Sequence, residues 1–228
     1  MKAKSIKGNS PQEIKAALEN AMSDGYTPTL AIIFISVKQD HKAICKLMDD
    51  AGIAVFGCTT NGEFIDEATE KGSIAILLLD INRSYFQIYF EEYPEKNYRE
   101  ITNRIAQKVK ERFSAPAFFI AGSNMETDAE ELLFGFEDVV GKEVNVYGCM
   151  AGDDFTFSDQ FVFTNEYSSS RGLVCLALDE EKIMIRGVAT CGWRAVGTLR
   201  TVTKSSGNHV YTVDDIPVLD LTTKYGGL

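Results

Sequence analysis

The sequence Val-Phe-Gly-Cys-Thr-Thr at residues 55–60 recurs as Val-Tyr-Gly-Cys-Met-Ala at residues 146–151. A short apolar run precedes each copy, and another apolar run follows, at residues 72–79 and at residues 172–178. Runs of this length that are rich in β-branched and aromatic residues are typical of strands buried on both faces. Their recurrence in the same order predicts two related structural units in one chain.

Each unit is expected to contain a strand, a helix, a second strand, the Gly-Cys turn and two further strands. The predicted repeats span about residues 30–113 and 116–193, and a C-terminal hairpin is expected at about 196–214. No Gly/Ser-rich linker separates the repeats, so we expect one core and a single domain over residues 1–228. The predicted fold class is α/β of the mixed α+β type, with two pseudo-symmetric β-α-β-β-β repeats and helices flanking mixed sheets.

Local signals place several elements more closely. Ser10 is followed by proline and, three residues later, by glutamate, which indicates the start of a helix. Asp40 is expected to cap a second helix. Residues 72–80 and 85–92 are separated by a short polar segment and are predicted to form a hairpin. The sequence Phe-Val-Phe at residues 161–163 indicates an added strand in the second half.

Composition excludes several classes of protein. Of the 228 residues, 33 are acidic and 23 basic, and the resulting net charge of -10 disfavours nucleic acid and anionic membranes. The longest apolar runs fall far short of the ~20 residues that a membrane helix needs. No apolar segment follows the first lysines, so we expect no secretory signal and a cytoplasmic protein. Five cysteines, odd in number and widely spaced, do not indicate a disulfide framework.

The paired Gly-Cys turns are the first candidate for a ligand-binding site. Ligands of α/β proteins bind beyond the carboxyl ends of buried strands, where a glycine lets the backbone approach them closely. Two such turns that face one another would form a site from Gly57, Cys58, Thr59, Thr60, Gly148 and Cys149. The alternative is that both glycines make tight turns and both cysteines pack in the core.

Two further features are candidates for the same site. If Asp153 or Asp154 points inward, its carboxylate suits the ammonium group of an amino acid, whose carboxylate would bind N–H groups near Gly57. A solvated turn is the alternative, and no third ligand at suitable spacing indicates a metal site. Trp193 is the only tryptophan, and it either stacks on a ligand or lies in the core.

The remaining charged and titratable residues do not define an enzyme. Residues 182–213 contain five basic residues and no acidic ones, which indicates either an exposed strand edge or an anion site. His41 and His209 have no partner in a known nucleophile pattern, and no nucleotide-binding motif occurs. We therefore expect no enzyme activity, with a thiol-dependent enzyme using Cys58 or Cys149 as an alternative.

Six motifs, taken in order, resemble the N-terminal FIST domain over about residues 30–217. They are the GCTTNGE turn at 57–63, the segment 148–154, the strand at 161–163, the strand that begins at Gly172, Gly192-Trp193 with Gly197, and the stretch 202–208. One departure is that Cys149 and Met150 stand where the family more often has small residues.

The resemblance implies a sensory module of signalling proteins that binds small molecules such as amino acids. Some family members bind haem and sense nitric oxide, and here His41, His209 or a cysteine would then ligate the iron. Family members usually continue into a C-terminal FIST domain, often joined to a signalling output module, and these are the expected partners. We therefore expect a non-catalytic intracellular sensor of an amino acid or small carboxylate that uses no cofactor, with a haem-based gas sensor as the alternative.

Overall fold

The computed structural model describes residues 1–65, 68–188, 190–192, 194–195 and 197–226. The chain forms two compact units, Met1–Arg186 and Gly187–Leu228. Helices and mixed sheets occur together in the described residues, so the predicted mixed α+β class is confirmed. The single domain expected over the whole chain remains a prediction.

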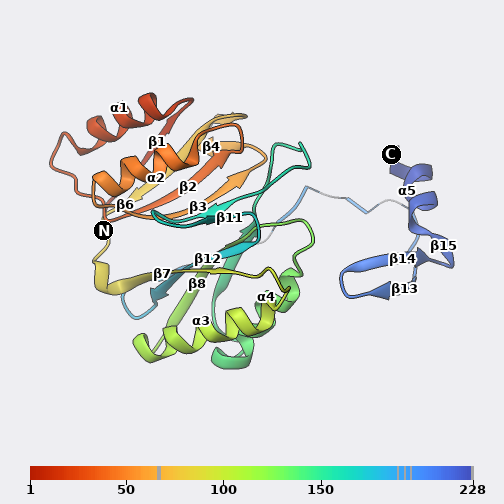
Figure 1. Cartoon of the computed structure of the whole chain (residues 1–228). Helices are drawn as coiled ribbons and strands as arrows, with labels where there is room; N and C mark the ends of the chain where they lie inside the picture. Colours follow the sequence, from red (N-terminus) through yellow and green to blue (C-terminus); the bar gives the residue numbers. More distant parts are fainter. Residues whose placement is uncertain (66–67, 189, 193, 196, 227–228) are drawn as a thin grey trace. The chain divides into compact units, whose positions relative to one another are not determined.

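The first unit contains two mixed sheets (Figure 1). The larger sheet is formed by β1 (Ala3–Gly8), β2 (Leu30–Ser36), β3 (Ala54–Thr60), β6 (Ile74–Leu79), β10 (Val162–Phe163) and β11 (Ser168–Ser169). The smaller sheet is formed by β7 (Phe86–Glu92), β8 (Pro116–Gly122), β9 (Val146–Met150) and β12 (Gly172–Asp179). A separate two-stranded ribbon of β4 (Glu63–Ile65) and β5 (Ala68–Glu70) follows β3.

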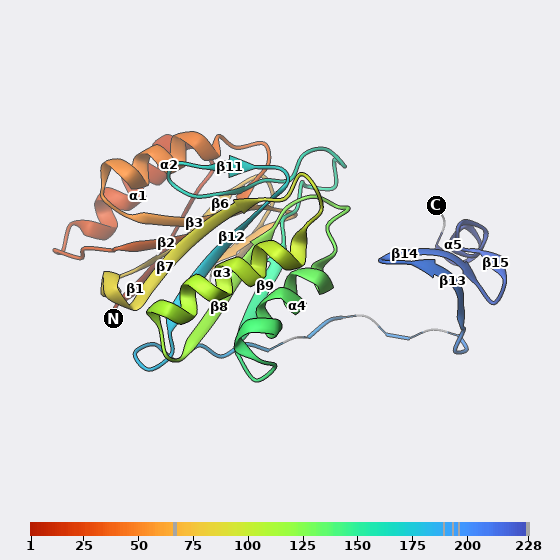
Figure 2. The same cartoon turned by 60° about the horizontal axis from the view of Figure 1, so that its bottom comes forward.

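Helices cover the outer face of each sheet, as Figures 1 and 2 show. The larger sheet is covered by α1 (Pro11–Met22) and α2 (His41–Asp50), and the smaller sheet by α3 (Tyr98–Arg112) and α4 (Ala129–Val140). Three of these helices begin at a side-chain cap, because Ser10, Asp40 and Asp128 each accept a hydrogen bond from a backbone N–H in the first turn. The first two of these starts confirm the predictions from the sequence.

The first unit is therefore a four-layer arrangement of helices, sheet, sheet and helices. Along β2, Ala31, Ile33 and Ile35 face the helices, whereas Leu30 belongs to the cluster between the two sheets. Successive side chains along a strand point to opposite faces of the sheet, which explains this division. Both faces of β2 pack against apolar cores, so both are apolar. A third apolar cluster lies under α3 and α4, so the unit has two helix-facing cores and one core between the sheets.

The two sheets have related topologies. The order β1-β6-β2-β3 in the larger sheet corresponds to β7-β12-β8-β9 in the smaller one. In both sheets the first two pairings are antiparallel and the last is parallel. The corresponding elements run from β1 to β6 for the larger sheet and from β7 to β12 for the smaller one. Each of these two sets contains two helices, whereas the repeat expected from the sequence contains one. The predicted β-α-β-β-β repeats are therefore not confirmed in that detail.

The predicted hairpin of residues 72–80 with 85–92 is wrong. β6 pairs with β1 and β2, whereas β7 pairs with β12 in the other sheet. The connection contains a short 3-10 helix, Arg83–Tyr85, and passes from one sheet to the other. Ile81 and Phe86 are buried between the sheets, and burying both of these apolar side chains stabilises the crossing.

The second unit contains its own small sheet and helix. β13 (Val202–Ser206) and β14 (His209–Val213) form an antiparallel hairpin, which lies within the range expected for one. β15 (Ile216–Pro217) pairs with β14, and α5 (Val218–Gly226) follows. Across the described parts of both units, no helix is both long enough and apolar enough to cross a membrane.

Candidate functional site

A cavity of about 620 Å³ lies between the two sheets of the first unit. Strands of the larger sheet contribute Phe34 and Leu77 to its wall, and strands of the smaller sheet contribute Phe119 and Cys149. Residues 61–65, in and before β4, line it as well. Most of the lining is apolar, so the cavity suits a ligand with an apolar body.

Both Gly-Cys sequences reach this cavity, although neither forms a turn. Residues 57–58 lie inside β3 and residues 148–149 inside β9, which corrects the expectation of two loops. Thr60, Gly148 and Cys149 line the cavity, while Cys58 lies buried between the sheets. The structure thus brings together four of the residues predicted from the sequence.

The two glycines are required by close packing. A Cβ atom on Gly57 would overlap the ring of Phe163 in β10, and one on Gly148 would overlap the carbonyl oxygen of Ile120 in β8. The Thr59 hydroxyl accepts a hydrogen bond from the Phe161 N–H at 2.9 Å, so this side chain holds the segment before β10. Gly57 and Thr59 therefore do not line the cavity, and their predicted ligand contacts remain untested.

A buried carboxylate closes the polar end of the cavity. Glu63 is only 2% exposed, and its Oε1 atom accepts a hydrogen bond from the Thr60 hydroxyl at 2.6 Å. Its Oε2 atom accepts bonds from the N–H and hydroxyl groups of Ser73 at 3.0 and 2.9 Å. Three donors balance the burial of this charge, and they tie β4 to the ends of β3 and β6.

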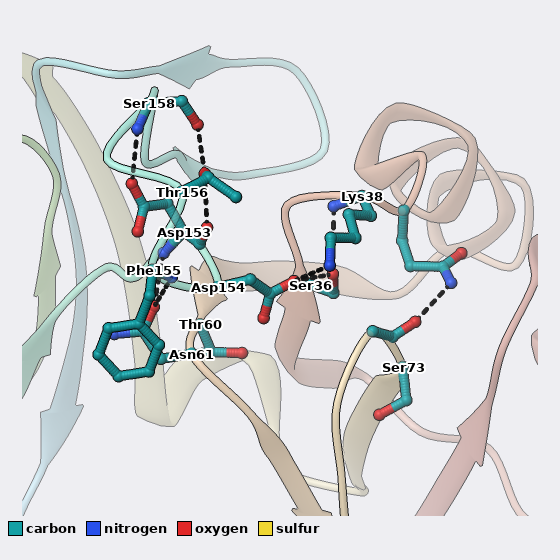
Figure 3. Close-up of polar contacts among 12 residues, drawn as sticks. Ser36, Lys38, Thr60, Asn61, Ser73, Asp153, Asp154, Phe155, Thr156 and Ser158 are labelled. Atoms are coloured by element: carbon teal, nitrogen blue, oxygen red, sulfur yellow. Dashed lines mark hydrogen bonds and ion pairs between the residues drawn. The ribbon is translucent and has the colours of Figure 1, made fainter.

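The adjacent aspartates have different positions (Figure 3). Asp153 points to the Ser158 N–H, from which its Oδ2 atom accepts a hydrogen bond at 2.8 Å. Asp154 points to the carboxyl end of β2, where its Oδ2 atom accepts a bond from the Ser36 hydroxyl at 2.6 Å and lies 3.9 Å from Lys38 Nζ. Neither aspartate lines the cavity, so their predicted contact with the ligand also remains untested.

Asn61 links the aspartate segment to the cavity. Its Oδ1 atom accepts a hydrogen bond from the Asp153 N–H at 2.8 Å, and its side chain lines the cavity. Among the described residues this side-chain amide NH₂ has no hydrogen-bond acceptor, so it can donate to a ligand at this wall. Glu63 and the phenylalanines that line the cavity, Phe34, Phe64 and Phe119, were not among the candidates from the sequence, although Glu63 lies shortly after the first Gly-Cys repeat.

The Cys58 and Cys149 thiols are hydrogen-bonded to one another, and their pKa values shift in opposite directions. The bond lowers the pKa of the exposed Cys149 thiol, against the effect of its partial burial. The same bond, together with burial, raises the pKa of Cys58. Burial raises the pKa of Cys45 to about 12 and also raises that of Cys175. Of the cysteines with a shifted pKa, Cys149 alone is made more acidic.

The other candidates lie away from the cavity. His41 stacks on Phe161 and Phe163, with ring centroids 5.4 and 5.0 Å away, and its Nε2 atom lies 3.0 Å from Ser168 Oγ. His209 begins β14 of the second unit. Trp193 lies outside the described residues. No group of three His, Cys, Asp or Glu residues that could hold a metal ion occurs in the described ranges.

The basic segment 182–213 is partly neutralised. Arg186 lies 2.8 Å from Glu180, and Arg200 lies 3.0 Å from Asp214. These ion pairs are formed with acidic residues just outside the segment. Because two of its arginines are paired with carboxylates, the segment is better interpreted as an exposed strand edge than as an anion site.

The first unit is thus a two-sheet α+β unit with a cavity between its sheets. The FIST N domain model matches residues 29–216, which is most of the chain. The chain therefore belongs to the FIST family, a family of sensory domains in signal transduction, and the resemblance inferred from its motifs is confirmed. No curated protein shows significant similarity to the chain.

Proposed function

We propose that this FIST N domain is a non-catalytic sensor that binds a small molecule in the cavity between its sheets. The observation that supports the proposal most directly is the cavity itself, which measures about 620 Å³ and is lined by residues of both sheets. A ligand there would contact both halves of the first unit at once. Ligand pockets of known proteins have similar volumes and similarly apolar walls.

The chemistry of the lining supports an amino acid with an apolar side chain as the first ligand class. Phe34, Leu77 and Phe119 offer apolar surface to the side chain. Glu63 accepts three hydrogen bonds, and a carboxylate has capacity for about four, which leaves room for an ammonium group. The amide NH₂ of Asn61 is a donor for the ligand carboxylate. A small carboxylate with an apolar body would use the same wall and the same amide.

Signalling follows if the ligand favours one arrangement of the two sheets over another. A ligand shifts such an equilibrium only by its difference in affinity for the two arrangements. We expect a C-terminal FIST domain or a signalling output protein in the cytoplasm to respond to this change in the arrangement of the sheets. We favour a small apolar ligand over haem, because His41 is engaged by Phe161, Phe163 and Ser168 and no described histidine lines the cavity. A cysteine ligand to haem iron would have to be Cys149, which lines the cavity and interacts with Cys58.

Thermal-shift and calorimetric titrations test the proposal. The panel contains leucine, phenylalanine, serine and several small carboxylates at millimolar concentration, and stabilisation by its apolar members is expected. A hundredfold excess over Kd would stabilise the domain by about 2.7 kcal/mol. No stabilisation by any member would contradict the proposed ligand class.

Two variants test the location of the site. Ala75 lines the cavity, so Ala75→Phe should fill part of it and weaken binding. Leu133 is exposed on α4, and Leu133→Phe is the matched control that should bind as the wild type does. Equal binding by both variants would place the ligand elsewhere.

A further inference from the structure

Two cysteines from different sheets meet at the wall of the cavity. Cys58 belongs to β3 of the larger sheet, and Cys149 belongs to β9 of the smaller sheet. The ends of the two strands meet, because the Gly152 N–H donates a hydrogen bond to the Thr59 carbonyl oxygen at 2.7 Å. Cys58 belongs to the apolar cluster between the sheets and Cys149 lines the cavity between them, so the two thiols face the same space. The contact is long-range, because about 90 residues separate the two cysteines in the sequence.

The two thiols differ in their access to solvent. Cys58 has no exposed surface, whereas Cys149 is exposed and lines the cavity. A small oxidant that enters the cavity therefore meets Cys149 first, with Cys58 directly behind it. Reversible dithiols have this arrangement of one accessible reactive thiol and one nearby resolving thiol.

The other described cysteines lack such a partner arrangement. Cys45 packs in the core under α1 and α2, and Cys175 packs in the core under α3 and α4. Cys191 is exposed and belongs to the second unit. This distribution makes Cys191 an accessible control and Cys45 a buried one.

We propose that Cys58 and Cys149 are a redox-active pair whose disulfide links the two sheets at the cavity wall. In the first step the Cys149 thiolate attacks a hydroperoxide. The O–O bond breaks, an alcohol or water leaves, and Cys149 becomes a sulfenic acid. In the second step the Cys58 thiol attacks the Cys149 sulfur and displaces water. Two thiols and one hydroperoxide thus give one disulfide, one alcohol and one water.

The electrostatics of the pair support these two roles. The hydrogen bond from Cys58 favours the thiolate of Cys149 and lowers its pKa, which makes Cys149 the better nucleophile near neutral pH. The same hydrogen bond, burial and the charge of the neighbouring thiolate raise the pKa of Cys58. Cys58 therefore keeps its proton until Cys149 has been oxidised and its negative charge removed.

Oxidation would also change the cavity. Formation of the disulfide turns the Cys149 sulfur from the cavity toward β3 and fixes the distance between β3 and β9. Since a ligand in the cavity would contact both sheets, the redox state of this pair would alter ligand binding. The pairing itself does not depend on the identity of the ligand, so it can be tested with or without one.

Peptide mapping of the full chain after brief treatment with hydrogen peroxide tests the proposal. The protein is alkylated, digested without reductant and analysed by mass spectrometry. We expect a cross-linked peptide that contains Cys58 and Cys149, with one disulfide per chain, and we expect dithiothreitol to remove it. In this experiment Cys45 should remain a thiol, and Cys191→Ser should leave the cross-link unchanged.

Two variants separate the roles of the pair. Cys149→Ser should abolish the cross-link and leave Cys58 reduced. Cys58→Ser should allow Cys149 to be oxidised, so that the sulfenic acid is trapped by dimedone. The wild-type map remains decisive even if a variant fails to fold. Oxidation of Cys191 while Cys58 and Cys149 stay reduced would overturn the proposal, and so would disulfides formed only between chains.

Discussion

Replacement of Glu63 is expected to destabilise the first unit strongly, although a single glutamate in a polar segment is ordinarily exposed. The Glu63 carboxylate is buried and accepts hydrogen bonds from the Thr60 hydroxyl, the Ser73 hydroxyl and the Ser73 N–H. In Glu63→Ala all three donors lose their acceptor. The anchor of β4 at the end of the cavity is lost with them.

The magnitude follows from the three contacts. A hydrogen bond to a charged group contributes about 1.5–3 kcal/mol, and the cost of burying the carboxylate cancels part of the sum. We therefore expect Glu63→Ala to lower the free energy of unfolding by about 3 kcal/mol. Glu63→Gln keeps an acceptor for Ser73 and turns its NH₂ toward the Thr60 oxygen, so it should lose about 1 kcal/mol.

Urea unfolding followed by circular dichroism measures both values. Glu70→Ala is the control, because Glu70 is part of a surface ion pair with Lys7 and should change stability by less than about 1 kcal/mol. If Glu63→Ala lowers the free energy of unfolding by no more than Glu70→Ala does, the three hydrogen bonds do not stabilise the cavity wall. Equal losses in Glu63→Ala and Glu63→Gln would refute the reasoning about the acceptor.

Three further predictions follow from individual contacts. Gly57→Ala would force its Cβ into the Phe163 ring and should lower the free energy of unfolding by about 1–3 kcal/mol in urea; an unchanged midpoint would contradict that packing. Burial lowers the pKa of His41 below 6.5, so the unfolded chain binds more protons, and stability should fall as pH drops below about 6.5; His41→Gln should reduce this fall, and an unaltered pH profile would refute it. Iodoacetamide should label Cys149 at lower pH in the wild type than in Cys58→Ser, as followed by mass spectrometry, because the interaction with the Cys58 thiol lowers the pKa of Cys149; the same labelling profile in both proteins would contradict the thiol pairing.

Much of the fold was predictable because it depends on local signals and on burial of both strand faces. The continuous apolar runs of β2 and β12 have both faces buried in cores, so they are apolar at every position. Ser10 and Asp40 cap helices through bonds within one turn, and such bonds are visible in the sequence.

Elements at the edge of the larger sheet were not predictable in the same way. β1 was missed because it contains two lysines and only one large apolar side chain, that of Ile6, and such a composition is typical of a sheet edge. The hairpin of β6 and β7 was predicted from a short polar connection. The structure separates the two strands because Ile81 and Phe86 carry the chain across the core between the sheets.

The candidate site was predictable only in part. The repeated Gly-Cys sequence located Thr60, Cys58 and Cys149 near one another, because the carboxyl ends of β3 and β9 meet where the Gly152 N–H donates a hydrogen bond to the Thr59 carbonyl oxygen. The roles of Glu63 and Asn61 depend on contacts with residues about 10 and 90 positions away, which no local pattern encodes. The same holds for the two aspartates, whose partners differ although they are neighbours in the chain.

The central claim is that a small molecule binds between the two sheets, and a crystal structure with the ligand of largest thermal shift tests it most directly. The account predicts electron density inside the cavity, with the apolar part between Phe34 and Phe119 and the polar end at Asn61 and Glu63. Density only outside the cavity, or a cavity closed by side chains in the complex, would contradict it.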